Sequence, residues 1–377
     1  MTEKWAVAGL AIMGLVVGAA AAEITDADVL NYNAAVASGN VEQIRAAAQQ
    51  LASAAIASEG DPQASLIAYE SGWVLCQIGA CAEALPAAEF AAAQAGGPEG
   101  ATLLKAFAAW KVNPSVANEK SVDAALGAIQ SAPPTGLSTS AVRERYASEL
   151  QSRNFDDAAR LAQLATAHFA AGGEAYERYL IEARTIDISS RFNVKPKASQ
   201  LEEMIHLRGE LSRSQHLYGD NVPDWMEKSF WVANAWQSAM NAFFSSEGKP
   251  GVSEKRAEQI LESYENGLEQ ADAKAADVDP EPKLPLCEGN FVRKPAMRYP
   301  SGMGSKGQFG ALIVRFRFEE GKVRDPEVLA AVPMDGFRDE VLKTISKWYF
   351  KPSVDPAKAG CTLNRDSLIQ EFVFSLQ

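Results

Sequence analysis

The four cysteines are the residues whose spacing most directly suggests chemistry, namely disulfide formation. Cys76 and Cys81 are close in sequence, but in an unbroken helix their Cα atoms would lie about 8.6 Å apart, beyond the roughly 7 Å limit for a bridge. They can therefore pair only if the chain turns between them, at Gly79. Cys287 and Cys361 bracket most of the C-terminal part, and a bridge between them would close a long loop. Free buried thiols are the alternative for each pair.

Other patterns typical of catalysis are weak or missing. His168, His206 and His216 lie in helical segments without a Cys or His at metal-ligand spacing, which favours packed or solvated imidazoles. The glycine pattern at 302–307 is followed by a predicted strand and not preceded by one, so it indicates a turn and not a dinucleotide site. The sequence therefore predicts a protein that is not an enzyme and holds no metal or cofactor. The alternative is an enzyme with a pocket of convergent polar groups between helices.

Length and charge limit the classes of function. A chain of 377 residues exceeds one ordinary core, which indicates at least two domains. Its net charge of −12 argues against nucleic-acid binding, because neutralising phosphates needs a clustered positive surface. From Cys287 onward there are 14 Lys and Arg residues against 11 Asp and Glu residues, so this part carries +3 and the rest −15. We expect a mildly basic C-terminal module on an acidic body.

Residues 1–22 predict a cleavable signal peptide. A short polar head precedes the apolar run that begins at Trp5, and four alanines provide a small-residue cleavage pattern before Glu23. The alternative is a retained anchor, because the apolar run borders on spanning length. Its glycines and alanines favour insertion less than Leu or Ile would, which favours cleavage. The predicted location is the periplasm, with no membrane span in the mature chain, or else the inner membrane with the body facing the periplasm.

Residues 23–275 predict an all-α body. Alanine-rich amphipathic runs are broken at Gly, Asn or Pro, as expected for consecutive helices. In the unit 68–98, small residues at Gly72, Ala84 and Ala91 would let two helices approach closely, and this spacing resembles the tetratricopeptide repeat. An irregular helical bundle is the alternative. The acidic, proline-spaced segment 276–286 predicts a stiff linker to the next domain.

Residues 287–377 predict a small α+β domain, because the hydrophobic period changes from 3.6 to 2. One strand has a buried set and a wetter set that alternate: Leu312, Val314, Phe316 and Phe318 against Ala311, Ile313, Arg315 and Arg317. A turn at 319–322 and a second strand at 323–331 complete a hairpin. A helix from Phe337 to Trp348 and a strand at 368–376 follow, which gives the order β-β-α-β.

This last domain resembles the C-terminal domain of TonB over about 90 residues. The residues that carry the resemblance are Tyr299, Pro300, Gly310, Gly321, Phe337, Trp348, Phe350 and Pro352. The resemblance implies a domain that binds protein partners in the bacterial cell envelope, in the best-known cases a segment of an outer-membrane transport receptor that adds a strand to the sheet. The chain departs from TonB in lacking a long proline-rich segment and the polar pair of the family's anchor. These departures put force transduction in doubt.

The final strand is the candidate partner-binding element, since it ends the chain and little in it would blunt a sheet edge. Its candidate residues are Leu368, Gln370, Phe372, Val373 and Phe374. We therefore expect an α+β multidomain protein with a tetratricopeptide-like body and a TonB-like domain. Its expected function is protein–protein interaction in the periplasm, by strand addition and through the helical surface. The alternative is a membrane-anchored, TonB-like energy transducer for outer-membrane transport.

Overall fold

The computed structural model describes residues 24–266, 284–295, 297, 299, 309–333 and 335–374. The chain divides into two compact units, residues 1–176 and 177–377. The predicted signal peptide, most of the predicted linker 276–286 and Pro300 lie outside the described residues. Within the described ranges, no helix is both long and apolar enough to cross a bilayer.

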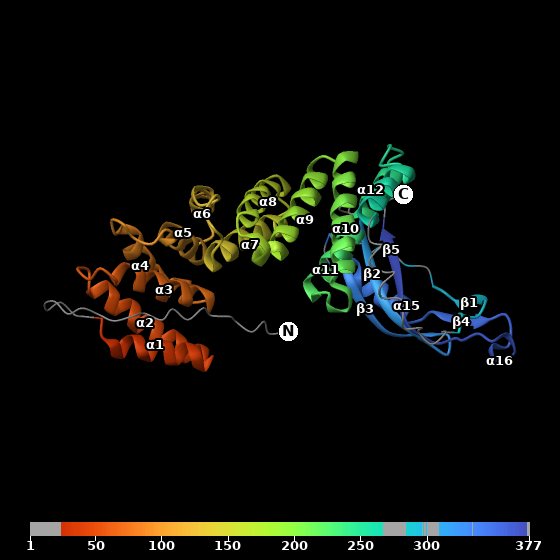
Figure 1. The fold of residues 1–377 in the computed structure, drawn as a ribbon, viewed down its shortest axis with the longest axis horizontal. Helices are drawn as coiled ribbons and strands as arrows, with labels where there is room; N and C mark the ends of the chain where they lie inside the picture. The colour runs from red at the N-terminus through yellow and green to blue at the C-terminus, as the bar shows by residue number, and fades with distance from the viewer. Residues whose placement is uncertain are drawn as a thin grey trace. The chain divides into compact units, whose positions relative to one another are not determined.

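The first unit is entirely helical in its described part, as the sequence predicts for this stretch (Figure 1). Its helices pack mainly on their neighbours in the chain. They are α1 (Asp26–Ser38), α2 (Val41–Ala57), α3 (Ala64–Gln77), α4 (Cys81–Ala93), α5 (Ala101–Val112), α6 (Val116–Ala128), α7 (Gly136–Gln151), α8 (Phe155–Ala170) and the short η1 (Gly173–Tyr176). Gly72 explains one close approach, because a Cβ there would lie 3.3 Å from Leu104 and 3.6 Å from the Ala84 carbonyl oxygen.

The described interior of the first unit contains two basic side chains that the hydrophobic pattern does not predict. Arg145 is only 2% exposed and donates to Asp123 at 3.0 Å and to Glu149 at 2.7 Å. His168 is equally enclosed, and its Nε2 lies 2.8 Å from the Ser138 hydroxyl. Buried polar groups are retained where such partners satisfy them.

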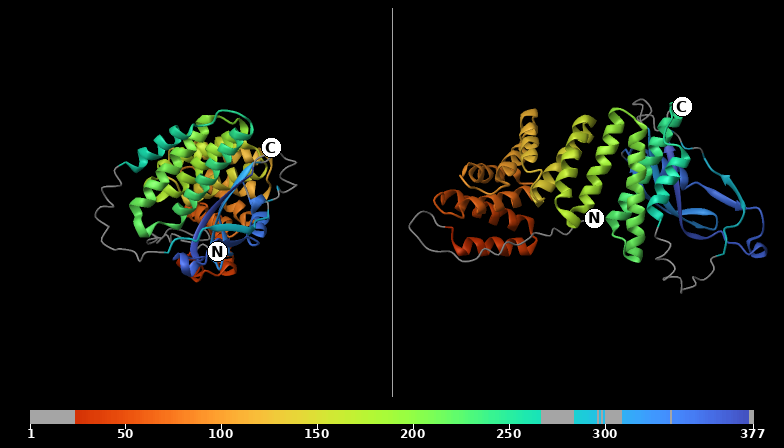
Figure 2. Two further views of the ribbon diagram at one scale, coloured as in Figure 1. Left: turned by 90° about the vertical axis from the view of Figure 1, so that its right-hand side faces the viewer. Right: turned by 45° about the horizontal axis from the view of Figure 1, so that its top comes forward.

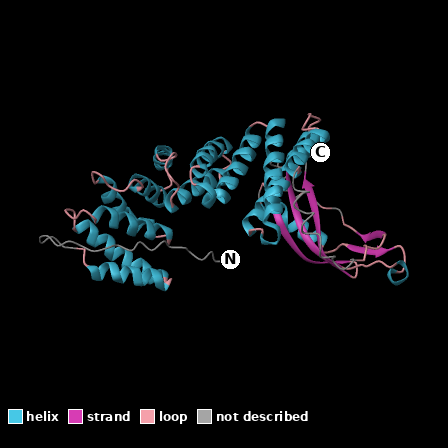
Figure 3. Cartoon of the chain, viewed as in Figure 1, coloured by secondary structure: helices cyan, strands magenta, loops and turns pink. Residues whose placement is uncertain are grey.

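The second unit combines four long helices with a sheet of five strands (Figure 3). The long helices are α9 (Glu177–Val194), α10 (Ala198–Tyr218), α11 (Asp224–Ser246) and α12 (Glu254–Glu265), with the short η2 (Gly219–Asn221) between α10 and α11. The strands are β1 (Gly289–Arg293), β2 (Gly310–Glu319), β3 (Lys322–Val332), β4 (Tyr349–Pro352) and β5 (Arg365–Phe374). The remaining helical elements are η3 (Asp335–Phe337), α15 (Arg338–Ile345) and α16 (Pro356–Ala359).

The sheet has the order β1-β4-β3-β2-β5, with all neighbours antiparallel. The predicted hairpin, helix and final strand correspond to β2, β3, α15 and β5. Strands β1 and β4 were not predicted, so the expected order β-β-α-β is incomplete. Both are too short for the alternation of side chains to stand out from the flanking chain.

Strand β2 is covered on both faces over its first half, which corrects the prediction of one wetter face there, whereas Arg315 is half-buried and Arg317 is exposed as expected. On one side Leu312 and Val314 share a core with Phe337 and Val341 of the η3–α15 segment. On the other side, Ala311 and Ile313 belong to a core that α9 to α12 supply, and α11 makes the principal helix contact with the sheet. Figure 2 shows this helical layer beside the sheet.

The contact division of the chain therefore falls within the helical region, between Tyr176 and Glu177, and not at the predicted linker. Helices α9 to α12 belong with the sheet because their apolar side chains bury the second face of β2 and β3. The aromatic run of α11 contributes to this core, with Trp236 and Phe244 buried. Helical periodicity alone does not reveal which partner a helix will cover.

We predict that Gly321→Ala destabilises the protein more than Gly360→Ala does. Both glycines have left-handed φ angles, +76° and +61°, which L side chains adopt at a cost of about 1–2 kcal/mol. A Cβ at Gly321 would also lie 2.2 Å from the Phe350 carbonyl oxygen, whereas nothing lies within 4 Å at Gly360. Urea unfolding should give a loss above about 2 kcal/mol for Gly321→Ala and about 1 kcal/mol for Gly360→Ala. Equal losses would contradict this account.

We also predict that protonation of His168 destabilises the first unit. Burial lowers the pKa of this imidazole below 6.5, although backbone contacts with Gln130 and Ile129 oppose the shift. The unfolded chain then takes up the proton first, so the stabilisation present above pH 6.5 is lost as the pH falls towards the folded-state pKa. The urea midpoint of unfolding should fall as the pH is lowered from about 7.5 to about 5. It should fall less steeply in His168→Gln than in the wild type. An unchanged slope in the variant would exclude this role.

Candidate functional site

Strand β5 forms one end of the sheet in the described part of the chain. It pairs with β2, with Ala311 opposite Val373 and Val314 opposite Gln370. Its other edge has no strand partner among the five described strands. Such an edge presents backbone N–H and C=O groups that can pair with another extended chain.

The side chains of β5 divide between the two faces of the sheet. Leu368, Phe372 and Phe374 pack on the core that includes α15, and of these Phe374 is fully buried. On the opposite face, Ile369 and Val373 are 47% and 44% exposed. The predicted strand residues are therefore brought together, but they do not share one face.

Glu371 lies on the same face as Ile369 and Val373, but it is half-buried and opposite Ile313. Burial lowers the pKa of Arg208 on α10, and the Glu371 carboxylate acts against this shift. The Glu371 carboxylate therefore faces the helical layer and its half-buried Arg208.

The segments before β1 and β5 meet and close the sheet at one point. Leu286 and Thr362 form a parallel bridge, in which the Cys287 N–H donates to the Thr362 carbonyl at 3.1 Å. The Thr362 N–H donates to the Pro285 carbonyl at 2.9 Å. The disulfide between Cys287 and Cys361, with Cα atoms 4.9 Å apart, covalently fixes the same junction.

Both predicted disulfides are present in the structure. The second joins Cys76 at the end of α3 to Cys81 at the start of α4, with Cα atoms 4.2 Å apart. The turn expected at Gly79 separates these helices, and its φ of +82° is one that glycine adopts readily. This interruption of the helix brings the two sulfur atoms within bonding distance.

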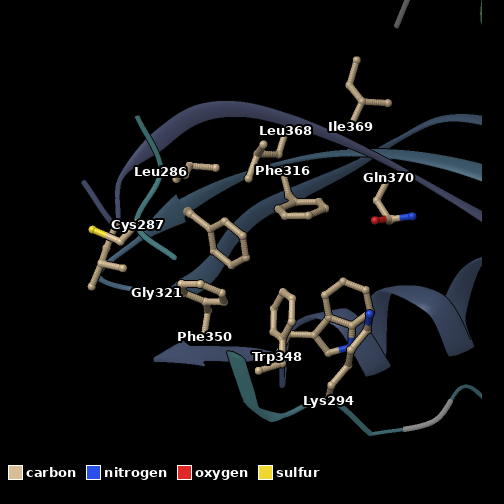
Figure 4. A pocket seen from close by; sticks show the side chains of 13 residues that line it. Leu286, Cys287, Lys294, Phe316, Gly321, Trp348, Phe350, Leu368, Ile369 and Gln370 are labelled. Carbon is tan, nitrogen blue, oxygen red and sulfur yellow. The ribbon is translucent and has the colours of Figure 1, made fainter. Parts of the chain in front are cut away.

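A cavity of about 290 Å³ lies inside the curl of the sheet, between β1–β4 and the β2–β5 pair (Figure 4). Most of its walls are apolar and aromatic. They are Leu286, Cys287, Phe291, Phe316, Phe318, Gly321, Trp348, Phe350, Leu363, Leu368 and Ile369, with Lys294 and Gln370 as the polar members.

Two donors lie at the polar side of this cavity, the exposed Lys294 ammonium and the buried Trp348 indole N–H. The Lys294 ammonium lies 4.8 Å from the centre of the Trp348 ring and 5.1 Å from that of Phe291. Figure 4 shows Lys294 beside the Trp348 indole. The indole N–H is buried, and no residue that the structure describes accepts a hydrogen bond from it. In the described ranges, no carboxylate forms an ion pair with Lys294.

The residues that carry the TonB resemblance gather at two places. Tyr299, Phe337 and Phe374 form one aromatic cluster, in which the Phe337 and Phe374 ring centres lie 4.3 Å apart. Gly310 fits against this cluster, because a Cβ there would lie 2.6 Å from the Phe337 ring. Burial raises the pKa of Tyr299, whose hydroxyl finds no hydrogen-bond partner within the described part of the chain.

The second place is the cavity, where Trp348, Phe350 and Gly321 line the wall. Pro352 ends β4 and pairs with Gly289 of β1. Sequence reasoning did not identify Phe291 and Lys294 as site residues. Their only signal was their position shortly after Cys287, whose predicted bridge places that segment beside the last strand.

The described walls of the cavity present apolar and aromatic surface beside one ammonium group. In the described part of the chain, no cluster of three His, Cys, Asp or Glu side chains could hold a metal ion. Comparison of the chain with protein-family models, with curated proteins and with solved structures finds no match. The site must therefore be interpreted from its own geometry.

We predict that removal of the Cys287–Cys361 bridge destabilises its unit more than removal of the Cys76–Cys81 bridge destabilises the other. The bridges join residues 74 and 5 positions apart, and a longer closed loop restricts the unfolded chain more. In the chain-entropy model, the paired alanine variants lose about 4 and about 2 kcal/mol, respectively. Urea unfolding of the two double variants provides the measurement. A larger loss for the short loop would contradict the prediction.

Proposed function

We propose that the chain is a protein-binding component of the bacterial periplasm, and that an extended segment of its partner adds to the sheet beside β5. The observation that carries the proposal is the open edge of β5, a strand of ten residues that pairs only with β2 among the described strands. Backbone hydrogen bonds along this edge would supply affinity, and the flanking side chains would select the partner sequence.

The other end of the sheet is less suited to the same role. Strand β1 has five residues, and its pairing with β4 shifts register between Phe291 and Arg293. Short strands and bulges are two ways in which proteins protect sheet edges from unwanted pairing. Strand β5 is twice as long and contains neither proline nor lysine, so it is the more open template.

The disulfides support an oxidising compartment. All four cysteines are paired. Paired cysteines are typical of exported proteins and rare in reducing compartments. They agree with the signal peptide expected at 1–22.

The proposed edge can be tested with a matched pair of proline variants, Ile369→Pro and Gln370→Pro. Both side chains are exposed, and their backbone N–H groups point to opposite sides of β5 because the residues are adjacent. One N–H bonds to β2 and the other faces the open edge. Proline is tolerated only where the lost N–H faces outward.

The readout is photo-crosslinking from Val373, introduced as a photoreactive residue, in envelope preparations of the source organism. Val354, which is similarly exposed in the same unit, is the control position. We expect a crosslink to the partner from Val373 and none from Val354. One of the two proline variants should keep the wild-type circular dichroism spectrum, and in that variant the crosslink from Val373 should be lost. A full crosslink in that folded variant would refute strand addition.

A further inference from the structure

The cavity inside the curl is not needed for strand addition at β5. Leu368, Ile369 and Gln370 contribute to its wall, but its remaining lining comes from other parts of the domain. These are β1 and Lys294 after it, β2, the β2–β3 turn, Trp348 and β4, and the segments beside the Cys287–Cys361 bridge. A protein core is normally packed without voids larger than a few water molecules. An aromatic-lined pocket of about 290 Å³ beside a covalent junction is therefore a candidate site for an occupant of its own.

The volume limits the size of that occupant. An apolar cavity of about 150 Å³ holds one benzene molecule, which has six heavy atoms. By this measure, the cavity of about 290 Å³ accommodates about twelve heavy atoms. The aromatic walls formed by Phe291, Phe316 and Phe318 would contact a flexible hydrocarbon chain or a small ring system.

The positive charge of Lys294 at one side of the cavity indicates the polar part of the ligand. Lys294 rests on the Phe291 and Trp348 rings without a carboxylate partner in the described ranges, and the nearby Trp348 N–H lacks an acceptor. A carboxylate beside Lys294 would neutralise the ammonium, which has no ion-pair partner in the described part of the chain.

The mouth of the cavity is apolar and accessible. Leu286, which lines it beside the disulfide, is 39% exposed. Exposed aliphatic side chains beside an apolar pocket lower the cost of passing a hydrocarbon chain from water to the interior. A ligand can therefore enter without removal of the strands that form the walls.

We propose that this cavity is a binding site for a small amphipathic carboxylate of about twelve heavy atoms, such as a medium-chain fatty acid. The hydrocarbon part lies among the aromatic rings, and the carboxylate lies beside Lys294 and the Trp348 indole. This site does not depend on a protein partner at β5. It adds a second ligand, of a different chemical class, to the same domain.

Calorimetric titration of the full chain with decanoate and with decanol tests the proposal. Decanoate should bind saturably at one site, and decanol at least about tenfold more weakly, because it cannot pair with an ammonium. Lys294→Met should remove this difference. Lys343→Met, at an exposed position on α15, should leave it intact. The proposal is overturned if decanoate shows no saturable binding up to about 1 mM. It is also overturned if wild type and Lys294→Met prefer decanoate over decanol by the same factor.

The location is tested by fluorescence quenching and by filling the cavity. Decanoate brominated beside its carboxylate should quench wild-type fluorescence more than that of Trp348→Phe, and decanoate brominated at its far end should show a smaller difference. Leu368→Trp should abolish binding of both ligands. If Leu368→Trp does not fold, the quenching result decides alone, and equal quenching in wild type and Trp348→Phe would exclude this cavity. The proline variants at β5 test strand addition, so the two proposals can fail separately.

Discussion

Burial of both faces of β2 is the constraint on which the second unit depends. A strand with Leu312 and Val314 on one side and Ala311 and Ile313 on the other must lie between two layers, because every one of these side chains is almost fully buried. The η3–α15 segment supplies one layer and α11 the other. The small side chain of Ala311 and the absence of one at Gly310 let these layers approach closely. The helices from α9 onward are therefore part of the domain that contains the sheet.

The same constraint determines the character of β5, which pairs with β2 along most of its length. Near its C-terminal end the strand is held on both faces, by the stacking of Phe374 on Phe337 and by the proximity of Glu371 to Arg208. Its free edge nevertheless gains no strand partner within the described sheet. Anchored faces and an open edge are the conditions under which an added strand would find a rigid template.

Much of this organisation follows from local sequence patterns, and the rest follows from contacts between distant residues. The alternation from Ala311 to Phe318 and the helical spacing from Phe337 to Trp348 identify β2 and the segment that covers it, while Gly79 identifies the turn that Cys76 requires. Strands β1 and β4 are too short to carry a period. The partner of α11, the burial of Arg145 and the position of Lys294 each depend on chain that is remote in sequence. The candidate strand could be predicted, whereas the cavity beside it could not.

Edge and cavity have a common origin in the incomplete closure of the sheet. Strand β4 joins β3 through a single residue pair, Lys322 and Tyr349, so β1–β4 diverges from the strands centred on β2. Gly321 permits this junction, because the Phe350 carbonyl occupies the space that a side chain would need. On the opposite side, the bridge between Leu286 and Thr362 and the adjacent disulfide bring the two ends of the sheet together at only one point. A complete closure would pair β5 along its length and fill the interior with side chains. Closure at two points leaves a free edge outside and an aromatic space within, and these two features carry the two binding proposals.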